Sequence, residues 1–424
     1  MKKLCIFGLG YVGLPLACLA SEKGYKVFGV DVDEKKVKFI NNGMSPINDE
    51  ELKNNLKILK GKIHATSDGI NAVKDSDIVV ICVPTPLDKN FHPDTSYVKS
   101  AAETISRGLK KEHLIIVEST VSPLTTEEDI LPILESSGLR SADDFMLAFC
   151  PERIDPGNKK FKLINIPRVI GGINKKSTEK AIEFYNSILD ADVLDIGSPR
   201  NAEAVKIMEN AFRDINIAFV NEMAKSFDKM GINIIDVIKG ASTKPFAFMA
   251  HYPGCGVGGH CISVDSYYLI ERANKKGFEH RFLQLARTIN NSMPEYTVNC
   301  VVKGLNEISK SVRNTKITVL GMAYKGNIDD TRESPAFKII EKLKNMGGEV
   351  KVFDPYVTGM SDFENLYDAL SCECIVIVTD HDEFKHLDLN LVKERGVKVI
   401  IDGRNILDKE KVKERGIVYN GIGR

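Results

Sequence analysis

The stretch KLCIFGLGYVGLPLACLASEKGYKVFGVDVD, residues 3–33, decides the fold of the first third of the chain. It begins with an apolar run that ends in a glycine-rich turn, continues as a helical pattern, and closes with a second apolar run. Gly8, Gly10 and Gly13 have the spacing G-x-G-x-x-G, and Asp31 ends the second run. This order of strand, glycine turn, helix and acid-terminated strand predicts the first βαβ unit of a Rossmann-like fold, which binds a dinucleotide.

Each residue of this motif has a physical task in nucleotide binding. Gly8 permits the tight turn, Gly10 lets a pyrophosphate approach the backbone, and Gly13 lets the helix pack closely on the strand. The helix N-terminus faces the phosphates, and the Asp31 carboxylate accepts hydrogen bonds from the adenosine ribose hydroxyls. Because a carboxylate repels a 2′-phosphate and no Arg follows Asp31 immediately, we expect NAD rather than NADP. The alternative is a Rossmann-like core that binds no ligand.

The composition is that of a globular protein with more than one core. A chain of 424 residues, 43% hydrophobic and 27% charged, predicts two or three domains. The 58 basic and 58 acidic residues cancel, which gives no reason to expect nucleic acid or an anionic membrane as the main partner. The apolar N-terminal run is too short for a signal peptide, and no uncharged stretch has the length of a membrane span. The nine scattered cysteines are typical of reduced, mostly buried thiols, so we expect a cytoplasmic protein.

The order of strand and helix patterns divides the chain into three predicted domains. The apolar runs DIVVICVP, HLIIVEST and FMLAFCPE alternate with helical patterns, which predicts a parallel sheet covered on both faces. From Asn201 a helical periodicity continues without proline to Gly231, and after Val312 the strand–helix alternation returns. The predicted fold class is therefore α/β, with two Rossmann-like doubly wound domains joined by a central helical domain with a long spine helix. The predicted boundaries are 1–200, 201–300 and 311–424.

A second glycine-rich stretch, GCGVGGHCISVD at residues 254–265, places a thiol in flexible backbone. A zinc site needs three or four ligands, and Cys255, His260 and Cys261 have no second Cys/His pair at the usual spacing, so we expect no metal. A Cys255–Cys261 disulfide is less compatible with a cytosolic chain. If Cys261 opens a helix, the helix dipole stabilises its thiolate and Asp265 lies one turn away, as expected for a nucleophile. Taken alone, this stretch leaves a nucleophile and an ordinary glycine loop as open alternatives.

The whole chain resembles the nucleotide-sugar 6-dehydrogenase family, the UDP-glucose and UDP-N-acetylmannosamine dehydrogenases. The resemblance rests on long motifs in the family's order: FGLGYVGLPLA, CVPTP, VEST, FCPERIDPGN, NAEAVKIMENAFRDINIAFVNE, GVGGHCISVDSYYL, LGMAYKGNIDDTRESPA and DGRN. It implies an enzyme that carries out two successive NAD-linked oxidations, converting the C6 hydroxymethyl of a UDP-sugar to a carboxylate. The first domain would then bind NAD, the central domain would carry the cysteine loop, and the C-terminal domain would bind the UDP-sugar.

The resemblance also assigns the covalent chemistry to particular residues. It implies that Cys261 captures the aldehyde as a thiohemiacetal, whose oxidation gives a thioester that water hydrolyses. Lys206 and Asn210, one turn apart on the spine helix, match the family positions that stabilise charge on the C6 oxygen.

Three further catalytic residues come from the same resemblance. Asp265 matches the residue that organises water and proton transfer with Lys206. Thr120 in VEST and Glu152 in CPER match residues that hold the catalytic water and serve the acid–base steps.

Ligand-binding residues are implied in the same way. The residues that resemble cofactor contacts are Gly8, Gly10, Tyr11, Val12, Gly13, Asp31, Lys36, Thr85, Thr120 and Arg332. The residues that resemble substrate contacts are Glu152, Lys206, His251, Tyr252, Gly254, Gly258, Lys325 and Arg404. Two positions depart from the family pattern, because Lys36 stands where relatives often have Arg and Ser263 where many have Pro. The glycines at 258 and 259 are expected to let the sugar approach the sulfur.

The identity of the sugar follows from one segment. FCPERIDPGN followed by INIPRVIGG resembles the N-acetylhexosamine branch, so we expect UDP-N-acetylglucosamine or UDP-N-acetylmannosamine, with UDP-glucose as the alternative and UDP-N-acetylgalactosamine left open. The product would serve polysaccharide or glycan synthesis. A homodimer or higher homo-oligomer is expected, since the spine helix has wide apolar faces. Two other classes stay open: a nucleotide-sugar binding protein without catalysis, and a two-electron hydroxyacid dehydrogenase that needs no thiol.

Overall fold

The computed structural model describes residues 2–88, 91–141, 143–155, 158 and 160–424. The chain forms two compact units, Met1–Glu209 with Tyr267–Phe278, and Asn210–Ser266 with Glu279–Arg424. Each unit is described by itself. Two residues of the FCPERIDPGN motif, Pro156 and Gly157, lie outside the described residues.

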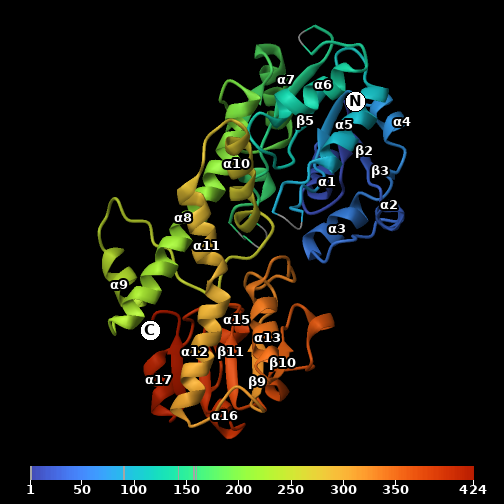
Figure 1. Ribbon diagram of the computed structural model, residues 1–424. Helices are drawn as coiled ribbons and strands as arrows, with labels where there is room; N and C mark the ends of the chain where they lie inside the picture. The colour runs from blue at the N-terminus through green and yellow to red at the C-terminus, as the bar shows by residue number, and fades with distance from the viewer. Residues whose placement is uncertain (1, 89–90, 142, 156–157, 159) are drawn as a thin grey trace. The chain divides into compact units, whose positions relative to one another are not determined.

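The first unit is built on an eight-stranded sheet within the described residues (Figure 1). Its strand order is β3-β2-β1-β4-β5-β6-β7-β8, so the chain starts in the middle of the sheet and winds outward in both directions, as in dinucleotide-binding folds. The strands are β1 (Lys3–Phe7), β2 (Lys26–Val30), β3 (Ile63–Thr66), β4 (Ile78–Ile81), β5 (Leu114–Val117), β6 (Met146–Phe149), β7 (Arg168–Gly172) and β8 (Val193–Asp195).

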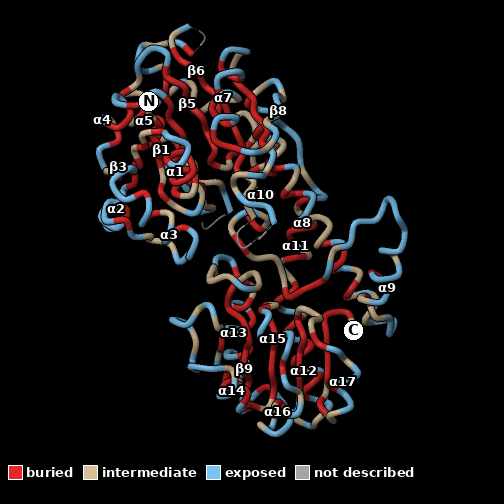
Figure 2. Tube along the Cα trace, turned by 180° about the vertical axis from the view of Figure 1, so that it is seen from behind, coloured by how far each residue is buried: buried red, intermediate tan, exposed pale blue. Residues whose placement is uncertain are grey.

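Both faces of this sheet are buried, which explains why its central strands are continuous apolar runs. Leu4 and Ile6 of β1 belong to one core cluster, while Cys5 and Phe7 belong to the cluster on the other face. Figure 2 shows β1, β5 and β6 as buried. The covering helices are α1 (Gly13–Glu22), α2 (Glu34–Asn41), α3 (Glu50–Ile58), α4 (Gly69–Lys74), α5 (Ser96–Gly108), α6 (Leu131–Glu135) and α7 (Lys175–Ile188).

A long helix, α8 (Pro199–Lys229), follows the first sheet and confirms the predicted spine helix. Pro199 occupies its first position, where a missing N–H costs nothing, and neither Pro nor Gly interrupts the helix after it. Gly231 has φ +70°, the left-handed conformation that ends helices, as its position in the sequence predicts. The other central helices are α9 (Ile234–Ala241), α10 (Ile262–Lys275), α11 (Arg281–Asn291) and α12 (Met293–Glu307).

The second unit contains a five-stranded parallel sheet in the part of the chain that is described. Its order, β10-β9-β11-β12-β13, is that of a second doubly wound fold. The strands are β9 (Lys316–Leu320), β10 (Glu349–Phe353), β11 (Cys374–Ile377), β12 (Val399–Asp402) and β13 (Val418–Gly421). The helices are α13 (Pro335–Asn345), α14 (Leu366–Ala369), α15 (Asp382–Lys385), α16 (Leu389–Glu394) and α17 (Lys409–Glu414). Two α/β sheets and the central helices between them along the chain confirm the predicted fold class.

The structure differs from the expected parallel sheet in one place. β7 runs antiparallel to β6, with Ala148 opposite Gly172 and Phe149 opposite Gly171. The described residues between these strands form a 3₁₀-helix, Leu163–Asn165, and no α-helix that could serve as the usual crossover of a parallel pair. Strands β3, β7, β8 and β13 were not predicted, since each lacks the continuous apolar run of a central strand.

Candidate active site

The glycine turn after β1 has the geometry that its sequence predicts. Gly8 has φ +91°, and a Cβ there would lie 2.5 Å from the Cys82 carbonyl oxygen. A Cβ on Gly13 would lie 2.0 Å from the Gly8 oxygen, so both glycines are required by the fold. At Gly10, by contrast, no described atom comes within 4 Å of such a Cβ. The turn is therefore closed by protein on two sides and open to a ligand beside Gly10.

Asp31 lies at the end of β2, next to this turn. Its carboxylate accepts hydrogen bonds from the backbone N–H of Leu9 at 3.0 Å and of Asp33 at 2.9 Å. The ammonium of Lys36 is 3.5 Å away, close enough for an ion pair. The Leu9 bond fixes the acid relative to the glycine turn, which is the arrangement that a ribose and its diphosphate require. These residues therefore fit a bound dinucleotide.

Two other predicted cofactor residues lie on loops that follow strands of the same sheet. Thr85 is buried, and its carbonyl accepts a hydrogen bond from the hydroxyl of Tyr268 on α10. Thr120, after β5, is half-buried. Loops after the carboxyl ends of parallel strands are where such folds bind their ligands.

Lys206 and Glu152 meet in the first unit. Both are buried, and the Lys206 ammonium donates to the Glu152 carbonyl oxygen at 2.5 Å. The Glu152 carboxylate accepts from the backbone N–H of Ile154. The Lys206 ammonium is thus held at the turn that carries the Glu152 carboxylate, and both are kinds of group that serve acid–base steps.

A buried polar cluster that was not predicted from the sequence contacts the turn at Pro151 and Glu152. Arg168, at the start of β7, donates to the Pro151 carbonyl at 3.1 Å, and the Tyr185 hydroxyl donates to Glu118. Cys82 lies 3.6 Å from the Glu118 carboxylate. Burial raises the pKa of Glu118, and the Arg168 guanidinium opposes that rise. Through the Arg168 bond the cluster holds the backbone at Pro151. Glu118 directly follows the apolar strand β5 and Arg168 begins β7, and these charges at strand ends were the signal in the sequence.

The segment that follows Thr120 is held in an unusual conformation. Leu124 has φ +77°, which is strained for a residue other than glycine, and a π-helix spans Thr126–Ile130. The fully buried carboxylate of Glu203, on α8, accepts from the backbone N–H of Leu124 at 2.6 Å and of Thr126 at 2.8 Å. These charge-assisted bonds stabilise the strained turn.

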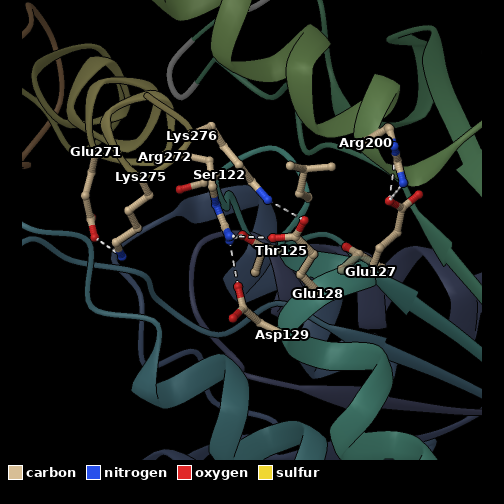
Figure 3. Close-up of polar contacts among 12 residues, drawn as sticks. Ser122, Thr125, Glu127, Glu128, Asp129, Arg200, Glu271, Arg272, Lys275 and Lys276 are labelled. Atoms are coloured by element: carbon tan, nitrogen blue, oxygen red, sulfur yellow. Dashed lines mark hydrogen bonds and ion pairs between the residues drawn. The ribbon is translucent and has the colours of Figure 1, made fainter. Parts of the chain in front are cut away.

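Arg272, on α10, forms polar contacts with the same segment (Figure 3). Its guanidinium donates to the Thr125 hydroxyl at 3.0 Å and to the Asp129 carboxylate at 2.6 Å. Lys276 donates to Glu128 at 2.8 Å, also visible in Figure 3. The Lys276–Glu128 pair is largely exposed and adds little stability, whereas the half-buried Arg272 orders the turn.

We expect a pH-dependent stability from Glu203. Burial raises its pKa from 4.5 to about 7. A carboxyl with a higher pKa in the folded state binds its proton more tightly there, so its contribution is fully present below pH 4.5 and is lost as pH rises through 7. As the pH rises from 4.5 to 7, ionisation of Glu203 should therefore lower the free energy of unfolding by about 3 kcal/mol. Urea unfolding at several pH values should show this slope in the parent and its loss in Glu203→Gln.

Glu128→Gln is the matched control for this measurement, because Glu128 is an exposed carboxylate of the same segment whose pKa is lowered, mainly by Lys276. The control should keep the slope between pH 5 and 7. Equal slopes in the parent and Glu203→Gln would contradict the assignment.

Cys261 lies directly before α10 in the second unit, as expected for a residue that opens a helix. All nine cysteines are free thiols, and Cys261 is the exposed one. The Asp265 N–H donates to the Cys261 carbonyl at 2.8 Å, and the buried Asp265 carboxylate accepts from Asn210 at 2.5 Å. Burial, helped by the Arg332 guanidinium, lowers the pKa of His260 below its ordinary value. An accessible thiol thus stands beside a fixed carboxylate–amide pair.

The glycines of the cysteine loop have a structural reason that the sequence did not show. A Cβ on Gly258 would lie 2.7 Å from the Tyr324 side chain, and Gly259 has φ +85°. The Gly259 N–H donates to the Arg332 carbonyl at 2.9 Å. Close packing on the 324–334 segment therefore requires these glycines, whatever space they also leave for a sugar. Ser263, at the position that departs from the family, donates its hydroxyl to the Gly259 carbonyl and so steadies the loop.

Arg404 and Lys325, the predicted UDP-sugar contacts, lie on loops after strands of the second sheet. The Arg404 guanidinium donates to Asp380 at 3.1 Å, and a Cβ on Gly254 would lie 3.0 Å from that guanidinium. Lys325 follows β9 in a loop whose Met322 and Ala323 N–H groups bond to the buried Asp354 carboxylate. Cations at the carboxyl ends of parallel strands suit a diphosphate.

The remaining predicted residues occupy loops of both units. Tyr11 and Val12 follow the glycine turn. His251 and Tyr252 precede the cysteine loop, and Arg332 pairs with Asp330 at 2.5 Å. Among the described residues, no group of three or more His, Cys, Asp or Glu side chains could hold a metal ion. None of the helices in the described part of the chain combines the length and apolarity needed to cross a membrane.

Three family models match successive parts of the chain. The NAD binding domain of the UDP-glucose/GDP-mannose dehydrogenase family matches residues 2–189, the central domain matches residues 200–292, and the UDP binding domain matches residues 318–409.

Individual relatives are similar over nearly their whole length. The chain is 39% identical to a UDP-N-acetyl-D-mannosamine dehydrogenase of Methanococcus maripaludis, covering 100% of this chain and 97% of that one. It is 33% identical to a UDP-N-acetyl-D-glucosamine 6-dehydrogenase of Pseudomonas aeruginosa, covering 96% and 98%. The solved structure of a UDP-D-ManNAc dehydrogenase from Pyrococcus horikoshii has a TM-score of 0.93 at 37% identity and covers 100% of this chain and 99% of that one.

The Rossmann fold, its glycine turn and the matched NAD binding domain define the class of protein, an NAD-dependent dehydrogenase. The chain belongs to the UDP-glucose/GDP-mannose dehydrogenase family. This confirms the family resemblance and the NAD cofactor, and the relatives support the N-acetylhexosamine branch.

Proposed function

We propose that the protein oxidises the C6 hydroxymethyl of a UDP-N-acetylhexosamine to the uronate, with UDP-N-acetylmannosamine or UDP-N-acetylglucosamine as substrate. The exposed thiol of Cys261 beside the Asn210–Asp265 pair is the observation that carries this proposal. A two-electron alcohol dehydrogenase has no need of such a thiol, whereas in a four-electron oxidation a thiol can hold the aldehyde as a covalent adduct for the second oxidation. The uronate would serve polysaccharide or glycan synthesis.

The covalent steps follow from the chemistry of a thiol. NAD, when bound at the glycine turn, supplies the two-electron acceptor for each of the two oxidations. The Cys261 sulfur adds to the aldehyde carbon and the carbonyl oxygen gains a proton, which gives a thiohemiacetal. Loss of a hydride and a proton from that adduct leaves a thioester, and water then cleaves the C–S bond to release the acid and the thiol.

The polar residues have separate tasks in these steps. Lys206 and Asn210 stabilise negative charge on the C6 oxygen, since each presents an N–H donor from α8. Asp265, held by Asn210, accepts a proton from water, and Glu152 and Thr120 orient that water. Arg404 and Lys325 bind the diphosphate, and residues 251–258 contact the sugar.

The names of the relatives favour an N-acetylated sugar over glucose. Both curated relatives named above act, by their names, on UDP-N-acetylhexosamines. Incubation with UDP-N-acetylmannosamine, UDP-N-acetylglucosamine, UDP-N-acetylgalactosamine and UDP-glucose, with NADH followed at saturation, tests the proposal. We expect two NADH per N-acetylhexosamine. Turnover confined to UDP-glucose would favour the alternative, and binding without turnover would indicate a binding protein.

We also propose that the protein is a homodimer or a higher homo-oligomer. On α8, Phe212 is 47% exposed and Phe219 is 57% exposed, and Phe246 and Met249 expose further apolar surface in the same unit. Phe212 and Phe219, seven residues apart, share one face of α8, and exposed apolar side chains along one helix face mark association surfaces. A monomeric mass by light scattering would contradict the proposal.

Finally, we propose residues 1–200 as the NAD domain, 201–300 as the central domain and 311–424 as the UDP-sugar domain. The cores of the two sheets and the extents of the matched family models support these boundaries.

A further inference from the structure

Buried polar groups form a continuous hydrogen-bonded chain between the two ends of the cysteine loop, residues 254–265. The Gly254 N–H donates to Asn221 Oδ1 at 3.0 Å, and Asn221 Nδ2 donates to Asn290 Oδ1 at 2.9 Å. Asn290 Nδ2 donates to Asp214 Oδ1 at 2.8 Å. At the other end of the loop, the Ser266 hydroxyl donates to Asp214 Oδ2 at 3.0 Å. Both ends of the loop are thus tied to one carboxylate.

All the side chains of this network are buried. Asp214, Asn221 and Ser266 have no exposed surface, and Asn290 has 1%. Arg287, also buried, donates to Asp214 at 2.7 Å and balances its charge. From Gly254 onward every donor points toward Asp214, so each bond polarises the next. A buried carboxylate is tolerable only with such a full set of donors.

The position of the network relates it directly to the residues of the proposed mechanism. Asp214 follows Asn210 by one turn of α8, and Ser266 follows Asp265 on α10. α8 and α10 therefore share two adjacent contacts, Asn210–Asp265 and Asp214–Ser266. Asp214, in the second contact, also accepts the last hydrogen bond of the chain that begins at Gly254.

We propose that Asp214 is a positioning residue that fixes both ends of the cysteine loop, through Ser266 at one end and through Asn290 and Asn221 at the other. By holding α10 and the start of the loop against α8, it sets the positions of Cys261 and Asp265. The proposal rests on the proposed function in that Cys261 is taken as the nucleophile. If the proposal holds, removing a hydrogen bond at either end of the network changes the position and the reactivity of the Cys261 thiol.

The test uses one variant at each end of the network, Ser266→Ala and Asn221→Ala, with Asp214→Asn at its centre. We expect kcat to fall about 10-fold or more in each, because small displacements of reacting groups are costly. KM for NAD should stay within about twofold, since the glycine turn belongs to the other unit. The matched control is Asp228→Asn, which removes a carboxylate of α8 that accepts from Tyr296 at 3.1 Å, away from the loop.

A second readout does not depend on catalysis. Cys261 is the exposed cysteine, so its alkylation by iodoacetamide, quantified by peptide mass spectrometry, reports on the loop itself. We expect the alkylation rate per folded molecule to change at least about threefold in the three network variants and not in the control. Rates that match the control, with kcat lowered only in proportion to folded protein, would overturn the proposal. Acid formation by Cys261→Ala would instead overturn the proposed function, and the alkylation result would still decide the role of Asp214.

Discussion

Replacing Cys261 with alanine should abolish formation of the uronate and lower the NADH yield from two per sugar to at most one. The side chain that holds the aldehyde is then missing, so the second oxidation has no thiohemiacetal to act on. We expect kcat for acid formation to fall by about 10³-fold or more, as for other enzymes that lose a nucleophile. The exposed position of Cys261 before α10 means that the fold loses no packed side chain. Product analysis by mass spectrometry, alongside NADH absorbance, measures both quantities.

Cys255→Ala is the matched control in the same loop. The Cys255 thiol is buried, lies 3.7 Å from the Gly403 carbonyl, and has a pKa raised by burial to about 11, so it cannot supply a thiolate at neutral pH. This variant should keep the yield of two NADH per sugar. Full conversion to the acid by Cys261→Ala would refute the covalent mechanism.

Two substitutions that each add one methyl group to the glycine turn should separate its role in cofactor binding from its role in folding. Gly10→Ala adds a Cβ where no described atom lies within 4 Å, so thermal unfolding should be unchanged. The same methyl occupies the open side of the turn and should weaken NAD binding by about 10- to 100-fold. Calorimetric titration with NAD and a thermal melt measure the two effects.

Gly13→Ala should instead destabilise the fold. Its Cβ would lie 2.0 Å from the Gly8 carbonyl oxygen, so the backbone must move and the free energy of unfolding should fall by about 3 kcal/mol or more. A Gly10→Ala variant with parent-like NAD affinity would show that the cofactor does not approach the turn there. A stable Gly13→Ala variant would show that the turn is less tightly packed than described.

Much of the fold was predictable because its central strands are buried on both faces. Runs such as LIIV in β5 and MLAF in β6 are typical of strands of a covered sheet, and the helix between Pro199 and Gly231 has no breaker inside it. The antiparallel return of β7 was not predictable. The described residues before it form no crossover α-helix, and nothing in RVIGG itself sets the direction of the strand.

The candidate site shows the same division. The motifs placed Gly8 and Asp31 at strand ends and Cys261 at a helix start, because apolar runs, glycines and helix signals are local features of the sequence. The cluster of Glu118, Arg168 and Tyr185 comes from segments far apart in the chain, and no spacing rule connects them.

By itself, then, the sequence determined the dinucleotide turn and the place of a thiol at a helix start, and it predicted the cations that we propose for a diphosphate. Only the tertiary structure decided what supports them. The loop glycines prove to be packed against residues 324–334, and both ends of the cysteine loop are tied to Asp214. The physical reason is that local motifs depend on dihedral angles and near neighbours. A buried carboxylate, by contrast, is stable only where helices distant in sequence bring their donors together.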